Sequence, residues 1–425
     1  MHVYLEFLGC RLNAAEVEDM ARRFAGAGWT VVESPLQADV IVFNSCAVTA
    51  QAARKSRHRL RTLHHRNPDA RFAVTGCWAT EDVARARQLP GVFWVIPNAD
   101  KAQVVETVTG VVADPADWEP GRWGHTRAFL AVQDGCDHTC TYCVTRLLRG
   151  IARSCSLQDA VNAVEHLVDH GAQEVVLTGV SLGAYGHDLG MSQGLAALSE
   201  VILNRTMLPR LRLSSVEPWD VDDRLLRLLE NPRFCRQLHL PLQSGSETVL
   251  RRMGRRSTAA QFAELVAAAR AISPDVAITT DVIVGFPGET DAEFAEGLAF
   301  VERIGFARLH VFPYSERTGT PAVRLPGRVP EHVRVQRAAQ MRTLGESSAM
   351  AYRAGFLGQT LPVLWENRDA QGYWCGWTDN YLAVKTLSAE SLGNCIRQTC
   401  LTTANAEFFL GEVEAPAVNF EDESS

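Results

Sequence analysis

The chain has 425 residues, of which 46% are hydrophobic and 21% are charged, and its formal net charge is −7. This length predicts two to four domains, and the composition is that of an ordinary globular protein. The negative charge excludes a protein that binds nucleic acid over its whole surface, so any RNA partner must meet a local basic patch. No stretch is apolar enough to cross a bilayer and the first residues do not resemble a signal peptide, so we expect a cytoplasmic protein without membrane contact.

Residues 1–115 alternate short apolar runs with stretches of helical periodicity. This alternation predicts βαβ units, and we interpret the segment as an N-terminal α/β domain with a mostly parallel sheet. Three of the strand-like runs end in a cysteine, namely Cys10, Cys46 and Cys77. Ligands of open α/β sheets gather at the carboxyl ends of the strands. If these three strands are neighbours, the thiols can meet at one point although they are far apart in the sequence.

The segment 114–127 is rich in Pro, Gly and Trp and lacks periodicity, so we interpret it as a linker. Six βα repeats follow, and we assign residues 122–352 to a central domain with a partial (β/α) barrel fold. The chemistry of such barrels lies at the C-terminal ends of the strands. Cys136, Cys140 and Cys143 follow the first of these strands, where this rule places an active site.

The spacing of Cys136, Cys140 and Cys143 favours an iron–sulfur cluster. Three thiolates on a four-iron cube leave one iron without a protein ligand, and an open coordination position is where chemistry can occur. The alternative is a structural zinc loop, for which His138 is the candidate fourth ligand although it would crowd the turn. Eleven scattered cysteines also fit metal or redox use in the cytosol better than a disulfide framework.

Residues 353–418 follow a long helix and show short alternating strands separated by turn residues. They predict a small antiparallel β-barrel of the kind that binds oligonucleotides. Its aromatic side chains can stack on bases, although about half of them are expected to fill the interior of the barrel. These aromatic residues are Trp365, Tyr373, Trp374, Trp377 and Tyr381.

The motif CDHTCTYC, with Tyr142 before its last cysteine, resembles that of the radical S-adenosylmethionine (SAM) enzymes. The domain order and the blocks GCRLN, NSCAVT, VTGC, LPLQSG and TDVIVGFPGET extend the resemblance to the methylthiotransferase family of these enzymes. The resemblance implies SAM, a terminal barrel called TRAM and two 4Fe-4S clusters. The radical SAM cluster would bind Cys136, Cys140 and Cys143, and an auxiliary cluster would bind Cys10, Cys46 and Cys77.

Within this family, GCRLNAAEVE and NSCAVTAQAARKSR are most similar to the branch that methylthiolates C2 of N6-threonylcarbamoyladenosine next to the tRNA anticodon. Leu12, Ser45 and Ala47 depart mildly from its blocks. Residues 144–150 lack an expected Ile-Pro pair, which concerns the local loop geometry and not cluster ligation. Three alternatives are a branch acting on isopentenyladenosine in tRNA, a branch acting on a ribosomal-protein aspartate, and a non-catalytic iron–sulfur protein that binds RNA and senses redox state.

Residues in or near the cluster loop and at strand ends of the predicted barrel are candidates for contacts with SAM, since barrel chemistry occurs there. A glycine at such a position allows the backbone to approach a ligand closely. For the other residues the alternative is an ordinary cap of a strand or of the following helix. The candidates are Tyr142, Gly179, Ser215, Glu217 and Gln243.

The basic stretch 53–66 directly follows Cys46 and is predicted to be a helix that contacts tRNA phosphates. A solvated surface helix is the alternative. Residues 251–256 form a second basic cluster. The expected electron donor is a protein such as flavodoxin or ferredoxin, and the expected state is a monomer. The residues predicted to bind RNA are Arg54, Lys55, Arg57, Arg59 and Arg61.

Overall fold

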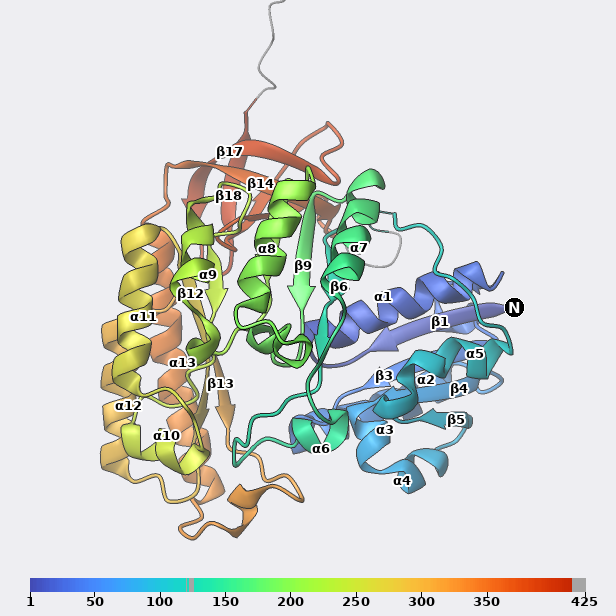
Figure 1. The fold of residues 1–425 in the computed structure, drawn as a ribbon, viewed down its shortest axis with the longest axis horizontal. Coiled ribbons are helices and arrows are strands. Elements are labelled where there is room, and N and C mark those ends of the chain that lie inside the picture. Colours follow the sequence, from blue (N-terminus) through green and yellow to red (C-terminus); the bar gives the residue numbers. More distant parts are fainter. Residues whose placement is uncertain (120, 122–125, 415–425) are drawn as a thin grey trace, which may run out of the picture.

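The computed structural model describes residues 1–119, 121 and 126–414, and it arranges them in three regions that follow one another along the chain (Figure 1). An N-terminal sheet with its helices, drawn in blue, lies beside a central set of strands and helices, and a closed β-barrel, in red, lies at one end of the central region. The predicted domain limits at residues 122 and 418 fall outside the described residues. Within the described part of the chain, no helix is long and apolar enough to span a membrane.

The N-terminal region is a five-stranded sheet in which all neighbouring strands run parallel. Its strands are β1 (His2–Phe7), β2 (Thr30–Val31), β3 (Val40–Ser45), β4 (Arg71–Gly76) and β5 (Val92–Ile96). Its helices are α1 (Arg11–Gly26), α2 (Ala50–Arg66), α3 (Cys77–Glu81), α4 (Val83–Arg87) and α5 (Val104–Thr109). The strand order is β2-β1-β3-β4-β5. The three strands that precede the cysteines are therefore adjacent, which is the condition that the sequence left open.

Strand β3 is buried along its whole length and has helices on both of its faces. Phe43 packs in one apolar cluster with Leu63 of α2, whereas Val42 packs in another with Phe24 of α1. Successive side chains of a strand point to opposite faces, so a central strand between two layers must be apolar at every position. The sequence VIVFNS satisfies this requirement until its end, where polar residues begin the functional region.

The central region contains the six parallel strands that the βα repeats predict. They are β6 (Ala128–Ala131), β9 (Glu174–Thr178), β10 (Arg210–Leu213), β11 (Gln237–His239), β12 (Ala277–Val284) and β13 (Arg308–Pro313). They form two sheets, β10-β9-β6 and β11-β12-β13, which bridges such as that of Ser215 with His239 connect into an open barrel. A short antiparallel pair, β7 (Gln133–Asp134) and β8 (Arg153–Ser154), flanks the cysteine loop.

The helices of the central region cover the outside of this open barrel (Figure 1). Capping boxes start two of them, with Thr258 before α11 and Gln261 in its first turn, and with Thr290 before α12 and Glu293 in its first turn. The helices are α6 (Thr145–Arg149), α7 (Leu157–Asp169), α8 (Gly194–Arg205), α9 (Asp223–Arg227), α10 (Glu247–Met253), α11 (Ala259–Ile272), α12 (Asp291–Ile304) and α13 (Glu331–Ala354).

The C-terminal region is a closed barrel with the order β14-β15-β16-β18-β17. Its strands are β14 (Thr360–Arg368), β15 (Trp374–Thr378), β16 (Ala383–Thr386), β17 (Cys395–Ala404) and β18 (Phe409–Val413). The small barrel is confirmed, but it is mixed and not purely antiparallel, because β16 and β18 run parallel. A closed ring of five strands cannot alternate direction all the way round, since five is odd.

The C-terminal barrel docks on the amino ends of β9 and β10. Arg212 is fully buried, pairs with Glu174 at 2.6 Å and donates to the carbonyl of Asp379 at 2.9 Å. Arg210 donates to the carbonyl of Pro362 at 2.6 Å. These bonds tie the barrel to the end of the central region that lies opposite the carboxyl ends of the strands. Of the predicted stacking residues, Trp365 and Trp374 are buried in the barrel.

Candidate active site

The cysteine loop of the central region is held in place by backbone hydrogen bonds at its ends and in its middle. The N–H of Cys136 donates to the carbonyl of Gly150 at 3.1 Å, and that of Thr141 donates to the carbonyl of Met253 at 2.9 Å. The departure from the family pattern after the last cysteine is accommodated by α6, which starts at Thr145. The Sγ of Cys143 lies 3.1 Å from the Oγ1 of Thr145. The loop is therefore ordered without the expected proline.

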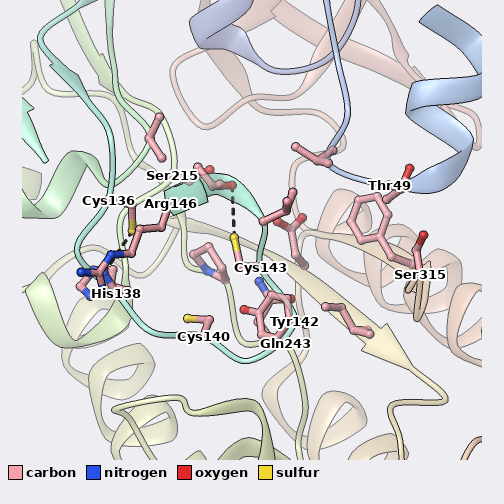
Figure 2. Close-up of a pocket in the computed structure, with 18 of the residues that line it drawn as sticks. Thr49, Cys136, His138, Cys140, Tyr142, Cys143, Arg146, Ser215, Gln243 and Ser315 are labelled. Atoms are coloured by element: carbon pink, nitrogen blue, oxygen red, sulfur yellow. Dashed lines mark hydrogen bonds between the residues drawn. The ribbon is translucent and has the colours of Figure 1, made fainter. Parts of the chain in front are cut away.

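Cys136, Cys140 and Cys143 line a cavity of about 340 Å³ at the carboxyl ends of the central strands (Figure 2). Burial raises the pKa of the Cys136 thiol to about 11, so the metal-free thiol is protonated at neutral pH. Iron would displace these protons, since thiolates are the ligands of iron–sulfur clusters.

A single zinc ion fits the spacing of the thiols poorly. Three thiolates on one tetrahedral zinc would lie about 3.8 Å apart, given a Zn–S distance of about 2.3 Å. Among the described residues, neither cysteine triad brings its three sulfur atoms within 4.8 Å of one another. Wider spacing suits a multi-iron cluster, whose ligands bind different iron atoms.

Four of the five residues predicted to contact SAM line this cavity, namely Tyr142, Ser215, Glu217 and Gln243. Gln243 has a positive φ of 71°, a strained conformation for a residue other than glycine, and its N–H donates to the carbonyl of Asp281 at 2.8 Å. Gly179 does not line the cavity. A Cβ at this position would lie 2.8 Å from the Oε1 of Gln133, so this glycine allows close packing beside the site.

Arg255 is a buried charged residue of the site that the sequence did not single out individually. Its guanidinium pairs with Glu217 at 2.6 Å, lies 4.4 Å from the ring centre of Trp219 and approaches the Sγ of Cys140 at 4.0 Å. It also donates to the carbonyl of Pro241. A positive charge beside Cys140 favours the thiolate form of that residue. Arg255 belongs to the stretch 251–256, the second basic cluster of the sequence.

The N-terminal triad is assembled from the carboxyl ends of β1, β3 and β4. Glycines precede two of its cysteines and let the strand ends approach one another. A Cβ at Gly9 would lie 2.8 Å from the Sγ of Cys46, and one at Gly76 would lie 2.3 Å from the carbonyl oxygen of Ser45. Both glycines have positive φ. The pattern GC, present at Cys10 and at Cys77, therefore has a geometric reason.

Buried polar side chains surround the N-terminal triad. The Nδ2 of Asn98 lies 3.7 Å from the Sγ of Cys77, and the Sγ of Cys10 lies 3.6 Å from the Oδ1 of Asn13. Burial, with the neighbouring Cys77 and Cys10, raises the pKa of the Cys46 thiol to about 11. This set of three thiols, with an amide donor from Asn98, is chemically suited to hold a second iron–sulfur cluster.

Helix α6 joins the two triads. It starts two residues after Cys143, and its last residue, Arg149, is buried among acceptors of the N-terminal region. Arg149 pairs with Glu16 at 2.9 Å and donates to the Oδ1 of Asn13 at 2.8 Å. Lys101 also pairs with Glu16 at 2.7 Å. The two cations outweigh the effect of burial and lower the pKa of Glu16 to about 2.

The cavity itself is walled by both regions. Val48 and Thr49, which follow Cys46, line it together with the cysteines of the central loop. The N–H of Ala50 donates to the Oγ of Ser315 at 2.9 Å, so the start of α2 is fixed against the end of β13. Figure 2 shows Thr49 and Ser315 side by side at the edge of the cavity. The segment that directly follows Cys46 thus lies at the mouth of the central barrel.

The sequence of this chain is similar to known protein families and to individual proteins. Residues 2–96 match the model of the uncharacterized protein family UPF0004, and residues 130–301 match the radical SAM superfamily. The chain is 37% identical to the threonylcarbamoyladenosine tRNA methylthiotransferase MtaB of Thermotoga maritima, with 92% of this chain and 96% of that protein covered. It belongs to the radical SAM methylthiotransferase family. Membership of this family implies a 4Fe-4S cluster and SAM, as the cysteine loop and its cavity predict.

Other relatives are similar at comparable levels. The MtaB protein of Bacillus subtilis is 34% identical, with 91% of this chain and 90% of that protein covered. The tRNA-2-methylthio-N(6)-dimethylallyladenosine synthase of Thermobifida fusca is 35% identical, with 84% and 76% covered. Among solved structures, the radical SAM methyltransferase TsrM of Kitasatospora setae shares the fold, with a TM-score of 0.56, 13% identity and 76% of each chain covered.

The basic helix of this methylthiotransferase is only partly available to RNA. Arg59 pairs with Glu6 of β1 at 2.8 Å, so part of its guanidinium is already occupied, and its contact with RNA stays a prediction. Arg57 lies over the ring of Trp78 at 5.9 Å. Burial and the nearby charges of Arg85, Arg61 and Arg54 lower its pKa. Arg57 and its neighbours Arg54, Arg61 and Arg85 therefore form an excess of positive charge on one surface. Lys55 is exposed on the same helix.

Two of the four arginines in the second basic stretch, 251–256, are committed to ion pairs. Arg252 makes two hydrogen bonds to Glu293, at 2.8 and 2.9 Å, and Arg255 pairs with Glu217. Both arginines therefore serve the fold and the cavity, and this basic cluster is less available to RNA than its sequence indicates. The sequence signal was misleading because a run of arginines gives no indication of which acidic residues lie opposite them.

Proposed function

We propose that this enzyme methylthiolates C2 of N6-threonylcarbamoyladenosine in tRNA. One observation carries the proposal, namely that the central cysteine triad lines a cavity at the mouth of an open barrel whose wall also includes Val48 and Thr49, just after Cys46 of the N-terminal triad. The identity of the first relatives supports the choice of substrate, since four of them carry that activity in their names. We also infer a monomeric cytoplasmic enzyme that receives electrons from a protein such as flavodoxin or ferredoxin.

In this proposal Cys136, Cys140 and Cys143 hold the radical SAM cluster. When bound, the cluster and SAM supply one-electron cleavage and thus a carbon radical, which can remove hydrogen from an aromatic carbon that no base could deprotonate at neutral pH. Arg255 provides positive charge beside the Cys140 thiolate, and Glu217 fixes that arginine. The backbone of Gln243, fixed by its bond to Asp281, and the side chain of Ser215 shape the wall on which SAM would lie.

Cys10, Cys46 and Cys77 hold the auxiliary cluster, which would carry the sulfur that is inserted. The fit rests on the close approach that Gly9 and Gly76 allow. Asn98 orients this triad, because its Nδ2 faces Cys77 and also donates to the carbonyl of Leu148 at 3.0 Å. That bond ties the N-terminal triad to α6 and so fixes its position relative to the cavity where the base must lie.

The RNA side of the proposal is supported by two surfaces. One is the set of arginines on α2 and α4, close to the segment after Cys46 that walls the cavity. The other is a groove of about 690 Å³ along the edge strand β13, between α13 and the C-terminal barrel. Arg308, Arg342 and Arg353 line this groove, and Phe312 is shared between the groove and the cavity. Phosphates would lie in the groove while the target base, turned out of its loop, enters the cavity.

A second candidate substrate is dimethylallyladenosine, because the synthase of Thermobifida fusca is about as similar to this chain as the MtaB proteins are. The two products differ in mass. The deciding experiment is mass spectrometry of nucleosides from a strain lacking the gene, with and without the restored gene. Loss of the 2-methylthio form of threonylcarbamoyladenosine alone supports the proposal, whereas loss of the dimethylallyl product supports the second candidate. If neither product changes, both substrate assignments are wrong.

A further inference from the structure

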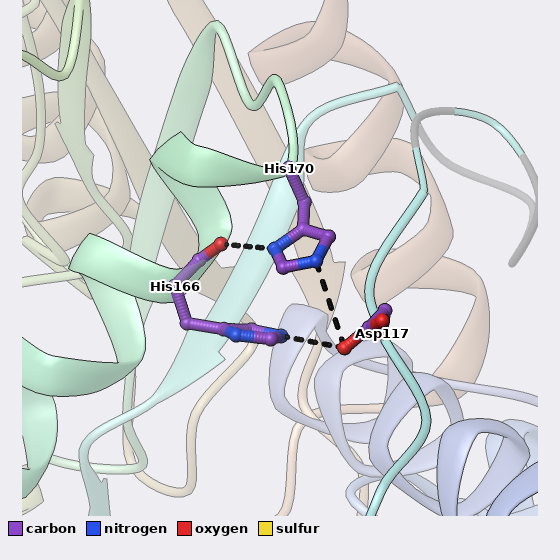
Figure 3. Close-up of side chains that lie close together, drawn as sticks. All are labelled: Asp117, His166 and His170. Atoms are coloured by element: carbon purple, nitrogen blue, oxygen red, sulfur yellow. Dashed lines mark hydrogen bonds and ion pairs between the residues drawn. The ribbon is translucent and has the colours of Figure 1, made fainter.

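Three potential metal ligands converge at the amino end of the central strands, opposite the cavity. His166 lies in the last turn of α7 and His170 caps that helix, while Asp117 comes from the segment that joins the N-terminal and central regions (Figure 3). One ligand atom of each residue lies within 4.8 Å of the other two. Neither the cluster chemistry nor the RNA surfaces use these residues.

The distances are those of ligands around an ion and not those of a direct hydrogen bond. The Nε2 atoms of His170 and His166 lie 3.6 and 3.8 Å from the Oδ1 of Asp117. Hydrogen bonds between nitrogen and oxygen measure about 2.7–3.2 Å. A tetrahedral zinc ion, with bonds of about 2.0–2.1 Å, holds its nitrogen and oxygen ligands about 3.4 Å apart. The separations here are therefore near those of a metal site.

The hydrogen bonding of His170 points to the same conclusion. Its Nδ1 lies 2.7 Å from the carbonyl oxygen of His166. A carbonyl only accepts, so Nδ1 donates to it and Nε2 is the ring atom turned toward Asp117. An Nε2 without a proton is an acceptor facing the carboxylate, and a cation between the two would satisfy both. Histidines that bind metals commonly donate their other N–H to a backbone carbonyl in this way.

Asp117 is held in position from both sides. Ala116 exchanges two hydrogen bonds with Arg22 of α1, at 2.8 and 2.9 Å. Trp118 is fully buried and donates to the Oε1 of Glu18 at 2.5 Å. One residue beyond His170, the carbonyl of Gly171 accepts from Asn394 of the C-terminal barrel at 2.9 Å. The three ligands thus lie where all three regions of the molecule meet.

We propose that Asp117, His166 and His170 form a binding site for a divalent transition metal ion of the zinc type, with water at the remaining position. Imidazole nitrogens exclude magnesium and calcium as the preferred ions. The position at the amino ends of the barrel strands, away from the cavity, gives the ion a structural role. It ties the connecting segment to α7 and thereby fixes the N-terminal triad relative to the central barrel.

The test is a zinc titration of the anaerobically purified protein with both iron–sulfur clusters loaded, so that the six cluster cysteines are occupied. We expect one zinc ion per chain beyond the iron. The variants His170→Gln and Asp117→Asn should each bind zinc at least tenfold more weakly, whereas His65→Gln, which changes an exposed histidine elsewhere, should bind it like the parent. Zinc should also raise the thermal midpoint of the parent and leave that of His170→Gln unchanged.

X-ray absorption at the zinc edge separates this site from adventitious binding to the remaining cysteines. The expected spectrum has a nitrogen and oxygen shell at about 2.0–2.1 Å and lacks a sulfur shell at about 2.3 Å. A sulfur shell, equal affinity in the His170→Gln variant, or the absence of zinc binding in the parent would each overturn the proposal. None of these measurements depends on the substrate of the enzyme.

Discussion

The two cysteine triads are assembled in different ways. Cys136, Cys140 and Cys143 lie in one short loop whose spacing is written in the sequence, while Cys10, Cys46 and Cys77 meet only because three strands are adjacent in a parallel sheet. A local loop can be recognised by spacing alone. A triad assembled from strand ends depends on the sheet order and on glycines that allow close approach. The comparison shows that similar ligand sets can be encoded locally or by topology.

Each triad also has a buried arginine paired with a glutamate, but the two pairs differ in their surroundings. The side chain of Arg255 is 1% exposed and its partner Glu217 is 20% exposed, at the wall of the cavity. The side chain of Arg149 is 2% exposed and its partner Glu16 is 11% exposed, in a network that also includes Lys101. The first pair serves the cavity, and the second joins two regions of the chain.

The largest expected effect separates the chemical roles of the triads. Cys143→Ala should abolish both SAM cleavage and product formation, because the central cluster loses a ligand. Cys46→Ala should abolish product formation and leave SAM cleavage to 5′-deoxyadenosine measurable under dithionite. Each variant should retain about half of the roughly eight irons of the parent. Cys235→Ala, which removes a buried cysteine outside both triads, is the control. Product formation by Cys143→Ala would contradict the assignment of SAM cleavage to the central triad.

The arginines should differ in their effect on stability. Arg149→Met leaves Glu16 buried and partly unpaired, so we expect it to lower the free energy of unfolding by about 3–5 kcal/mol. Arg255→Met leaves Glu217 closer to solvent, so we expect a smaller loss of about 1–3 kcal/mol. Urea denaturation of the cluster-loaded proteins under anaerobic conditions measures both. Equal losses would mean that the network around Arg149 gives no additional stability.

Glu18, on the helix α1 that follows Cys10, should make the stability of the folded chain depend on pH. Burial raises the pKa of Glu18 on α1 to about 8, from 4.5 when it is exposed. Between these values the folded chain holds a proton that the unfolded chain has released, so this contribution to stability is complete below pH 4.5 and falls as the pH rises toward 8.

Glu18→Gln should remove this dependence, because the amide stays neutral at every pH and can still accept from Trp118. Its advantage over the parent should grow by about 2 kcal/mol between pH 6 and pH 8 in urea denaturation. Glu106→Gln, a change at an exposed residue of α5, should show no such growth. A constant difference across this range would contradict the raised pKa.

The smallest effect concerns RNA. Arg61→Gln should weaken tRNA binding about two- to fivefold and reduce its salt dependence by about one counterion, because the exposed guanidinium is available to a phosphate. Arg59→Gln should change affinity much less, since Arg59 is occupied by Glu6. Filter binding at two or more salt concentrations distinguishes them. A larger loss for Arg59→Gln than for Arg61→Gln would show that the basic surface has been assigned to the wrong face of α2.

The sequence by itself predicted the three cysteine-ended strands, the six strands of the central region and both sets of cysteines, but not the short or edge strands β2, β5, β7 and β8. Alternating periodicity gave the three regions, since it reflects which residues are buried on each element. The spacing of the central cysteines identified their chemistry, because that loop is local. The glycines at Gly9 and Gly76 were visible in the motifs GC, although their reason, the close approach of neighbouring strand ends, was not.

Only the tertiary structure decided which charges are paired. Arg59, Arg149 and Arg255 have no distinguishing local signal, and their acidic partners come from distant segments that packing brings together. The same holds for Gly179, which packs against Gln133 and does not line the cavity, and for the parallel pair in the C-terminal barrel, which follows from closing an odd number of strands. Local sequence specifies elements and short loops, whereas pairing across a folded core depends on where the whole chain lies.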